Sequence, residues 1–418
     1  MEPHPQFPTS SMGVIIKPRE IVPNVHLIGA VDWDRRLLDA LIPLPHGTSY
    51  NAYFVQGSEK NALIDTVDPI HWQTLSRQLG ELPTPDYLVI HHVEQDHSGS
   101  TPMLLERYPE LTIVCNEKAN GMLIDHLHVN DARFHVVADG DTLSLGDKTL
   151  TFLFTPWVHW PETMSTWLDE DKILFSCDFF GSHYATSDVY ADKHEVYDDA
   201  KRYYAEIMMP FGAQVLKNIE KVTQYPIAII GPSHGPVYDD PGFIIEAYRD
   251  WAGGEPQNIV CLPYVTMHDS TRLMVDHLTA ALTDRGVAVE RFDLTTLDAG
   301  ELASSLVHAG TIVLGTPTVL TGPHPLAAYA AFLANALRPR AKFATVIGSY
   351  GWAGKTVETL VGMMPKLKVE LLDPVLANGM PRDADYAALD ALADTIAEKH
   401  KDLAPRNFAD LTVFRTER

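Results

Sequence analysis

The 418-residue sequence predicts two successive domains that mix helices and strands, an α+β domain over 1–252 and an α/β domain over 258–400. The first contains short β-rich runs with helical stretches between them. In the second, strands and helices alternate regularly, which is typical of a doubly wound parallel sheet that binds ligands at the carboxyl ends of its strands. The segment 253–257 (GGEPQ) breaks the periodicity and predicts the domain boundary. A charged C-terminal tail covers 401–418.

The elements follow from local patterns. In the first domain, we expect strands over 61–66, 87–90 and 149–154, and a helix around 103–108. Gly146 and Asp147 lie between alternating apolar runs, which predicts a hairpin turn. In the second domain, strands are predicted over 258–264, 287–294, 311–314, 342–347 and 369–372. A helix over 271–285 has an apolar face and ends before Gly286, a residue typical of that position.

The composition excludes several classes of partner. The chain has 55 acidic and 32 basic residues and a formal net charge of -23, a surface that repels nucleic acid and anionic lipid. No stretch approaches the roughly 20 apolar residues of a membrane-spanning helix, and the N-terminus has no signal-peptide pattern. Three scattered cysteines do not make a disulfide framework. We therefore expect a cytoplasmic protein that binds neither nucleic acid nor a membrane.

The densest group of potential metal ligands is the segment 91–97 (HHVEQDH), directly after the strand predicted over 87–90. Side chains alternate between faces in an extended chain, so His92 and Glu94 share a side and His91 points away. We interpret His92 as a ligand, and His91 as a packing residue or a group that orients a ligand. The alternative is a solvated polar loop, which the density of the cluster disfavours.

Three later segments place single candidates after apolar strands: 155–161 (TPWVHWP), 174–178 (LFSCD) and 229–235 (IIGPSHG). They present His159, Asp178 and His234. Each segment alone is more often structural than functional. Together with 91–97, however, they follow the order and approximate spacing of one known family.

That family is the metallo-β-lactamase superfamily, whose motif His-x-His-x-Asp-His is followed by His, Asp and His. This sequence carries Glu94 in place of the second histidine. Zinc sites favour imidazole and thiolate, whereas an added carboxylate gives a harder, more anionic site suited to iron. The pattern His-x-Glu-x-Asp-His resembles the flavodiiron proteins, and the resemblance extends over roughly 23–400.

The resemblance implies a metallo-β-lactamase-like αββα sandwich with two irons, followed by a flavodoxin-like FMN-binding domain. The implied ligands are His92, Glu94 and His159 for one iron and Asp96, His97 and His234 for the other, with Asp178 as the bridge. Two metals about 3.5–4 Å apart can engage both ends of a diatomic molecule. His183 and Tyr204 are candidates for orienting the ligands, with simple packing as the alternative.

Three predicted loops of the second domain resemble those that hold FMN in this family. The segment 266–271 (TMHDST) opens a helix and resembles the flavodoxin phosphate loop, because hydroxyls and free N–H groups at a helix N-terminus suit a phosphate. The same residue types are also common helix caps. The other two loops, with glycines and aromatics, follow the third and fourth strands. The candidate FMN contacts are Thr266, Met267, His268, Asp269, Ser270, Thr271, Thr316, Pro317, Thr318, Val319, Ser349, Tyr350, Gly351, Trp352, Ala353 and Gly354.

Three features depart from the family pattern. Leu320 and Thr321 stand where relatives often carry two asparagines, and Pro263 lies in a predicted central strand, where a missing N–H donor is disfavoured. Asp269 introduces a carboxylate into the phosphate loop. We expect this carboxylate to repel the FMN phosphate, so that Asp269→Asn would bind FMN more tightly. The alternative is that Asp269 points outward or caps the helix.

The resemblance implies an oxidoreductase that passes electrons from FMN to a di-iron centre and reduces dioxygen to water, nitric oxide to nitrous oxide, or both. A fused rubredoxin would need four cysteines, so we expect a separate donor, either a rubredoxin-like protein or a reduced deazaflavin coenzyme. In the family a head-to-tail dimer brings each flavin beside the partner's irons, so we expect a homodimer or a higher oligomer. The alternatives are a zinc-dependent hydrolase, disfavoured by Glu94, and an electron carrier with a vestigial metal fold, disfavoured by the complete ligand set.

Overall fold

The computed structural model describes residues 16–129, 133–352 and 354–406, which divide into two compact units. Unit 1 comprises Met1–Tyr204 and Phe211–Arg249, and unit 2 comprises Ala205–Pro210 and Asp250–Arg418. The division after Arg249 lies shortly before the predicted boundary segment 253–257. Among the described residues, no helix combines the length and the apolar character that crossing a membrane requires.

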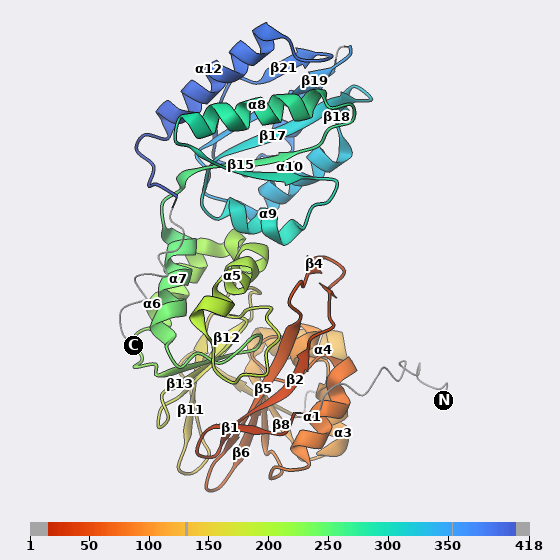
Figure 1. The fold of residues 1–418 in the computed structure, drawn as a ribbon. Coiled ribbons are helices and arrows are strands. Elements are labelled where there is room, and N and C mark those ends of the chain that lie inside the picture. Colours follow the sequence, from red (N-terminus) through yellow and green to blue (C-terminus); the bar gives the residue numbers. More distant parts are fainter. Residues whose placement is uncertain (1–15, 130–132, 353, 407–418) are drawn as a thin grey trace, which may run out of the picture. The chain divides into compact units, whose positions relative to one another are not determined.

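Unit 1 contains two β-sheets and a small hairpin (Figure 1). The first sheet has the order β1-β2-β5-β6-β7-β8-β9 and the second runs from β10 to β14. The strands of the first sheet are β1 (Arg19–Val22), β2 (Val25–Asp32), β5 (Thr48–Gln56), β6 (Asn61–Ile64), β7 (Tyr87–Val89), β8 (Thr112–Asn116) and β9 (Phe134–Val137). Those of the second are β10 (Thr142–Ser144), β11 (Thr149–Phe154), β12 (Met164–Leu168), β13 (Ile173–Cys177) and β14 (Ile229–Pro232), and the hairpin pairs β3 (Leu37–Leu38) with β4 (Ile42–Pro43).

Alternating side chains along the strands create the layers of unit 1. In β5, Ala52 and Phe54 pack against helices of the first sheet's outer face, whereas Tyr53 and Val55 face Phe152 and other residues of the second sheet. The helices are α1 (Trp72–Leu79), α2 (Gln95–Ser98), α3 (Thr101–Arg107), α4 (Glu117–Leu127), α5 (Lys193–Tyr203), α6 (Gly212–Val222) and α7 (Pro241–Gly253). This arrangement confirms the predicted sandwich, including the hairpin between β10 and β11.

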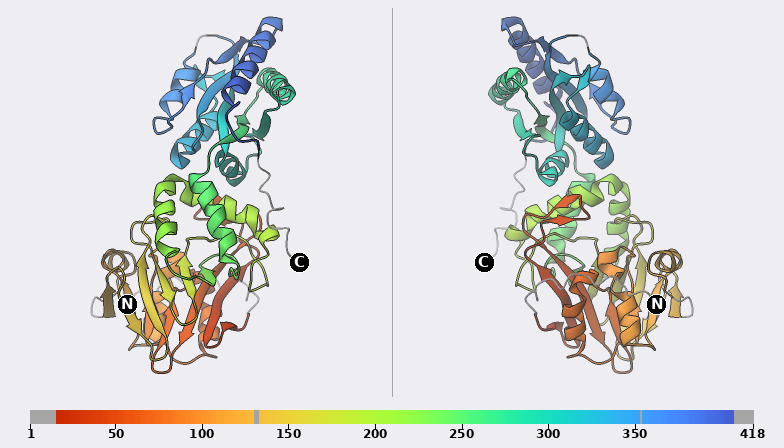
Figure 2. Two further views of the ribbon diagram at one scale, coloured as in Figure 1. Left: turned by 90° about the vertical axis from the view of Figure 1, so that its left-hand side faces the viewer. Right: turned by 90° about the vertical axis from the view of Figure 1, so that its right-hand side faces the viewer.

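Unit 2 has a parallel sheet of the order β16-β15-β17-β19-β20, with β21 parallel to β19 and β18 antiparallel to β17. Its helices flank the sheet on both sides (Figure 2). The strands are β15 (Gln257–Tyr264), β16 (Ala288–Asp293), β17 (Ala309–Val319), β18 (Gly322–Pro323), β19 (Phe343–Tyr350), β20 (Glu370–Leu371) and β21 (Val375–Asn378). The helices are α8 (Ser270–Asp284), α9 (Ala299–Leu306), α10 (Pro325–Leu337), α11 (Thr356–Gly362) and α12 (Asp383–Lys399). The predicted doubly wound sheet is confirmed.

Details of unit 2 both agree with and extend the sequence expectations. Helix α8 ends as predicted before Gly286, which has a φ of 73°. Pro263 stays within β15, opposite Phe292 of β16, so the proline does not end this central strand. The third and fourth strands run further than predicted, to Val319 and Tyr350, and β21 was missed.

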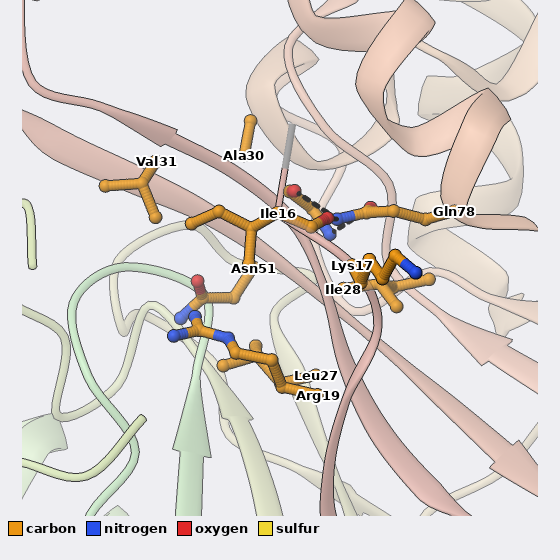
Figure 3. A pocket seen from close by; sticks show the side chains of 10 residues that line it. Ile16, Lys17, Arg19, Leu27, Ile28, Ala30, Val31, Asn51 and Gln78 are labelled. Atoms are coloured by element: carbon orange, nitrogen blue, oxygen red, sulfur yellow. Dashed lines mark hydrogen bonds between the residues drawn. The ribbon is translucent and has the colours of Figure 1, made fainter. Parts of the chain in front are cut away.

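A buried glutamine fixes the start of the first sheet (Figure 3). Gln78 of α1 is 2% exposed, and its amide donates to the carbonyls of Ile16 at 2.8 Å and Gly29 at 3.0 Å. Its oxygen accepts from the Gly29 N–H at 2.8 Å. Gly29 has a φ of +110°, and a Cβ atom there would lie 2.0 Å from the Tyr50 carbonyl oxygen. This close approach of β2 to β5 therefore requires glycine.

We predict that Gly29→Ala lowers the free energy of unfolding by about 1–3 kcal/mol or more, because it adds a disfavoured backbone conformation to a steric overlap. Gly121→Ala in α4 is the matched control, since a Cβ there meets nothing within 4 Å and alanine favours a helix by roughly 0.5–1 kcal/mol. Thermal and denaturant unfolding would measure both variants. Wild-type stability in Gly29→Ala would contradict the packing described.

Candidate metal centre and flavin loops

The seven side chains predicted to hold metal all follow strand ends of unit 1. Loops after β7, β11, β13 and β14 and the short helix α2 carry them, so their positions depend on how the two sheets end. Their side chains form two half-sites that meet at one carboxylate. They are His92, Glu94, Asp96, His97, His159, Asp178 and His234.

The first half-site joins two histidines to Glu94. The Nε2 atoms of His92 and His159 each lie 3.2 Å from Glu94 Oε2. The same two nitrogen atoms lie 3.6 and 3.5 Å from Asp178 Oδ2. The ligand atoms of these four residues are all within 4.8 Å of one another, close enough to surround one ion.

The second half-site uses the other oxygen of Asp178. Nε2 of His97 and Nε2 of His234 lie 3.1 and 3.4 Å from Asp178 Oδ1. Asp96 completes the group, with Oδ2 at 3.2 Å from His234 Nε2 and Oδ1 at 3.4 Å from His97 Nε2. Each oxygen of Asp178 therefore faces a different half-site, the arrangement expected of a bridging carboxylate.

The chemistry of this cluster fits two metal ions. Asp96 Oδ1, His97 Nε2 and Asp178 Oδ2 are buried and form no hydrogen bond within the described chain. Buried polar atoms normally have partners, and a metal ion would supply one for each of these three. The donor set has four imidazoles and three carboxylates and no thiolate, so it suits an ion harder than zinc.

The histidine neighbouring His92 has a different role. His91 donates its backbone N–H to Asp65 Oδ1 at 2.8 Å, and its ring nitrogens lie 2.9 Å from Asp65 Oδ2 and 2.7 Å from Thr166 Oγ1. Both ring nitrogens are thus engaged away from the half-sites. The structure agrees with the interpretation of His91 as a packing or orienting residue.

A tyrosine contacts the shared carboxylate, but it is Tyr203 rather than the Tyr204 suggested by the sequence. The Tyr203 hydroxyl donates to Asp178 Oδ1 at 2.9 Å. The Tyr204 ring instead packs on Tyr248, with 5.4 Å between ring centroids. His183 lies where the sequence suggested, 5.1 Å from His234 ring to ring, with Nδ1 2.9 Å from Thr48 Oγ1.

The sequence did not lead us to predict a further carboxylate, Glu162, which lies behind the cluster. Glu162 Oε1 lies 2.7 Å from His92 Nδ1, on the side of the ring that faces away from Glu94. The corresponding nitrogen of His234 lies 2.6 Å from the backbone carbonyl of Ser49. Such hydrogen bonds fix which ring nitrogen is free to bind a metal. The one signal in the sequence was an acidic residue three positions after His159.

The histidines and carboxylates of the cluster shift one another's pKa values. Burial alone would lower the pKa of His92, but hydrogen bonds with Glu162 and Glu94 raise it to about 9. Burial is likewise outweighed at His97 and His234, where the nearby Asp178 and Asp96 carboxylates raise each pKa to about 10. Burial would raise the pKa of Asp178, yet the surrounding histidines hold it well below its usual range.

A pocket of about 430 Å³ reaches the cluster from the surface of unit 1. Glu94 and Asp96 form part of its wall, together with apolar side chains such as Val93, Ile70 and Trp160. A small neutral molecule could therefore reach the ligands Glu94 and Asp96 along a partly apolar wall.

The predicted FMN contacts lie at the carboxyl ends of three adjacent parallel strands, β15, β17 and β19. The phosphate-loop candidate meets the β19 candidate directly, since Ser270 Oγ and Ser349 Oγ are 2.7 Å apart. Thr266 Oγ1 is buried without a hydrogen-bond partner within the described chain, so it could serve a ligand. Met267 and Trp352 are exposed, at 52% and 66%. Residues 316–319 belong to β17 itself rather than to a loop, and Ala353 lies outside the described residues.

The structure gives a physical account of two of the three departures from the family pattern, namely the pair Leu320 and Thr321 and the residue Asp269. Leu320 and Thr321 form the two-residue turn between β17 and β18 and have φ values of 50° and 69°. Asparagine tolerates this left-handed conformation better than leucine or threonine. Asp269 also has a positive φ, 64°, and its side chain does not cap α8.

The expected repulsion by Asp269 is not supported. Arg272 Nε donates to Asp269 Oδ1 at 2.9 Å, and this ion pair lies at the surface. The hydrogen bond and charge of Arg272 lower the pKa of Asp269. The carboxylate is therefore directed toward its own counter-ion, in agreement with the outward-pointing alternative.

Known proteins match nearly the whole chain. Residues 48–235 match the family model described as ODP family beta lactamase. A nitric oxide reductase of Moorella thermoacetica is 34% identical over 366 residues, covering 85% of this chain and 92% of the relative. A coenzyme F420H(2) oxidase of Methanothermobacter marburgensis is 37% identical over 359 residues, covering 82% and 88%. The solved structure of rubredoxin oxygen:oxidoreductase from Desulfovibrio gigas superposes with a TM-score of 0.89 at 32% identity, covering 92% and 99%.

We predict that metal binding to the metal-free protein releases protons. Because the pKa values of three ligand histidines are raised to about 9 or 10, a metal must displace their protons at neutral pH. The affinity for Zn²⁺, a redox-inert probe, should therefore rise as pH increases from neutrality toward those values. Calorimetric titration in two buffers of different ionisation enthalpy would count the protons. A pH-independent affinity without proton release would contradict these charge states.

We predict that Asp269→Asn changes the dissociation constant for FMN by less than about twofold, because an exposed ion pair contributes little and its carboxylate is already neutralised. Titration of apoprotein with FMN at low and high salt would measure this. Thr266→Val is the contrasting variant, which should weaken binding by removing a buried hydroxyl. Several-fold tighter binding by Asp269→Asn would restore the repulsion hypothesis.

Proposed function

Because this chain belongs to the flavodiiron family of oxidoreductases, we propose that it passes electrons from FMN to a di-iron centre and reduces dioxygen to water, nitric oxide to nitrous oxide, or both. Unit 1 would hold the irons and unit 2 the FMN. The relatives named nitric oxide reductase, rubredoxin-oxygen oxidoreductase and coenzyme F420H(2) oxidase support this proposal.

One observation carries the proposal, the position of Asp178 between the two half-sites. Its Oδ2 faces His92 and His159, and its Oδ1 faces His97 and His234. A carboxylate so placed can serve two ions at once. With Glu94 and Asp96 added, the cluster supplies three negative charges, which suits iron better than zinc.

The side chains have separate tasks in this proposal. Bound iron and FMN would supply the one-electron chemistry that no side chain here offers. His92, Glu94 and His159 would hold one ion, Asp96, His97 and His234 the other, and Asp178 would contact both. Tyr203 keeps a hydrogen bond on Asp178 Oδ1 and so fixes the orientation of that carboxylate. Val93, Ile70 and Trp160 would form an apolar part of the pocket wall near Glu94.

The FMN assignment rests on unit 2 alone. Three adjacent strands end at one edge of the sheet, where doubly wound sheets bind their ligands. The phosphate would be held at the start of α8 by Thr266, Ser270 and Thr271, and the ring would lie near Trp352. The exposure of Trp352 and Met267 leaves apolar surface available to cover a flat ring.

The electron donor would be a separate rubredoxin-like protein or a reduced deazaflavin coenzyme, the two classes that the names of the relatives contain. We further propose a head-to-tail homodimer or higher oligomer in the cytoplasm. The zinc hydrolase alternative is not favoured, because the named relatives are oxidoreductases.

The test is gas consumption by protein loaded with iron and FMN. Dioxygen and nitric oxide would be supplied separately, each with reduced rubredoxin and with the reduced deazaflavin coenzyme. We expect consumption of at least one gas with at least one donor. Asp178→Asn should lower the rate by more than the roughly 10–100-fold loss typical of groups that only orient metal ligands, because it weakens a direct contact to both ions.

Asp199→Asn provides the matched control. Asp199 is also a buried carboxylate beside a histidine, 2.9 Å from His46 Nδ1, but it belongs to neither half-site. This variant should keep the wild-type rate. Fully loaded protein that consumes neither gas with either donor would contradict the proposed function.

A further inference from the structure

One of the two half-sites, that of His92, has a buried glutamate on the side of the histidine ring that faces away from the other ligands. Glu162 lies between β11 and β12 and is 1% exposed. Its Oε1 lies 2.7 Å from His92 Nδ1 and accepts from the Val93 N–H at 3.1 Å. Since His92 Nε2 faces Glu94 and Asp178, a metal-binding His92 must carry its proton on Nδ1 and donate it to Glu162.

The second half-site has no equivalent. His234 Nδ1 lies 2.6 Å from the Ser49 carbonyl, which is a neutral acceptor. Asp65 lies near His97, but both of its oxygens are engaged by His91. Among the described residues, Glu162 is thus the one carboxylate hydrogen-bonded to the outward nitrogen of a ligand imidazole. The hydrogen bonds to the outward nitrogens of the two half-sites are therefore unequal.

A purely structural role explains this glutamate poorly. Its loop is already attached through the backbone, because Asn116 Nδ2 donates to the Glu162 carbonyl oxygen. Its second carboxylate oxygen, Oε2, is buried with no hydrogen-bond partner in the described chain. Burying a charge with an unpaired oxygen destabilises a fold. Accepting the hydrogen bond of the Val93 N–H is therefore not by itself a sufficient reason for a buried glutamate at this position.

We propose that Glu162 is a positioning residue that fixes the tautomer of His92 and makes the first metal position the more electron-rich of the two. This inference rests on the proposed di-iron function. A carboxylate that accepts from a ligand imidazole makes the imidazole a stronger donor, and a nearby negative charge in a dry site favours the ferric over the ferrous ion. With iron bound at both positions, the His92 half-site would therefore favour the ferric state more strongly than the other half-site.

The test separates charge from shape with two variants. Glu162→Gln keeps an acceptor oxygen for His92 and Val93 and removes the charge, whereas Glu162→Asp keeps the charge on a shorter side chain. For Glu162→Gln we expect one of the two Zn²⁺ affinities to fall by roughly 10–100-fold and the other to stay unchanged. In a redox titration followed by electron paramagnetic resonance, the half-reduced form should be less populated, because the two iron potentials move closer together.

The controls make each outcome decisive. Asp199→Asn, which alters a carboxylate–histidine pair outside the cluster, should leave both affinities and both potentials unchanged. Glu162→Asp should retain more of the potential difference than Glu162→Gln. Wild-type behaviour of Glu162→Gln, equal effects of the two variants, or a Glu162→Gln chain that does not fold would overturn the proposal. If wild-type protein held no redox-active irons, the di-iron function would fail, and the Zn²⁺ affinities would still test the role of Glu162.

Discussion

The candidate metal centre of unit 1 depends on the balance of charge around Asp178. This carboxylate is 1% exposed, and an isolated buried charge would be costly. Histidines from both half-sites approach its two oxygens within 3.1–3.6 Å, and the Tyr203 hydroxyl adds a hydrogen bond. These partners follow β7, β11 and β14 or lie on helices α2 and α5, which are distant in sequence. The sandwich therefore brings together strand ends that are distant in sequence, and their side chains place opposite charges around Asp178.

Much of this site could be predicted because four of its seven ligand candidates, His92, Glu94, Asp96 and His97, lie within one short segment. The segment 91–97 follows a strand directly, and alternation correctly turned His91 away from the cluster. The choice between Tyr203 and Tyr204 could not be made from sequence. Helix α5 ends at Tyr203 and a π-helical turn begins at Tyr204, which changes the side that each residue faces. Glu162 could not be predicted, because its burial depends on contact between its own loop and the segment that follows β7, which no local pattern reports.

In unit 2, local sequence patterns again predicted some features, whereas other features depend on tertiary contacts. The alternation of strands and helices predicted the sheet, but β17 and β19 extend beyond their apolar segments because they pair with β18 and β21. Pro263 remains in a central strand, against its local preference, because its neighbours complete the pairing. The counter-ion of Asp269 was within reach of sequence reasoning, since Arg272 lies three residues later on the same helix. At the turn, Leu320 and Thr321 adopt strained angles that a sequence pattern does not reveal.

The proposed function requires that the two half-sites hold two irons in contact with one carboxylate. Mössbauer spectroscopy of protein loaded with ⁵⁷Fe tests it most directly, because it counts the iron environments and detects magnetic coupling between them. We expect two high-spin irons per chain whose spins are coupled, with coupling weakened by Asp178→Asn and retained by Asp199→Asn. A single iron per chain, or two irons without coupling in the wild-type protein, would contradict it.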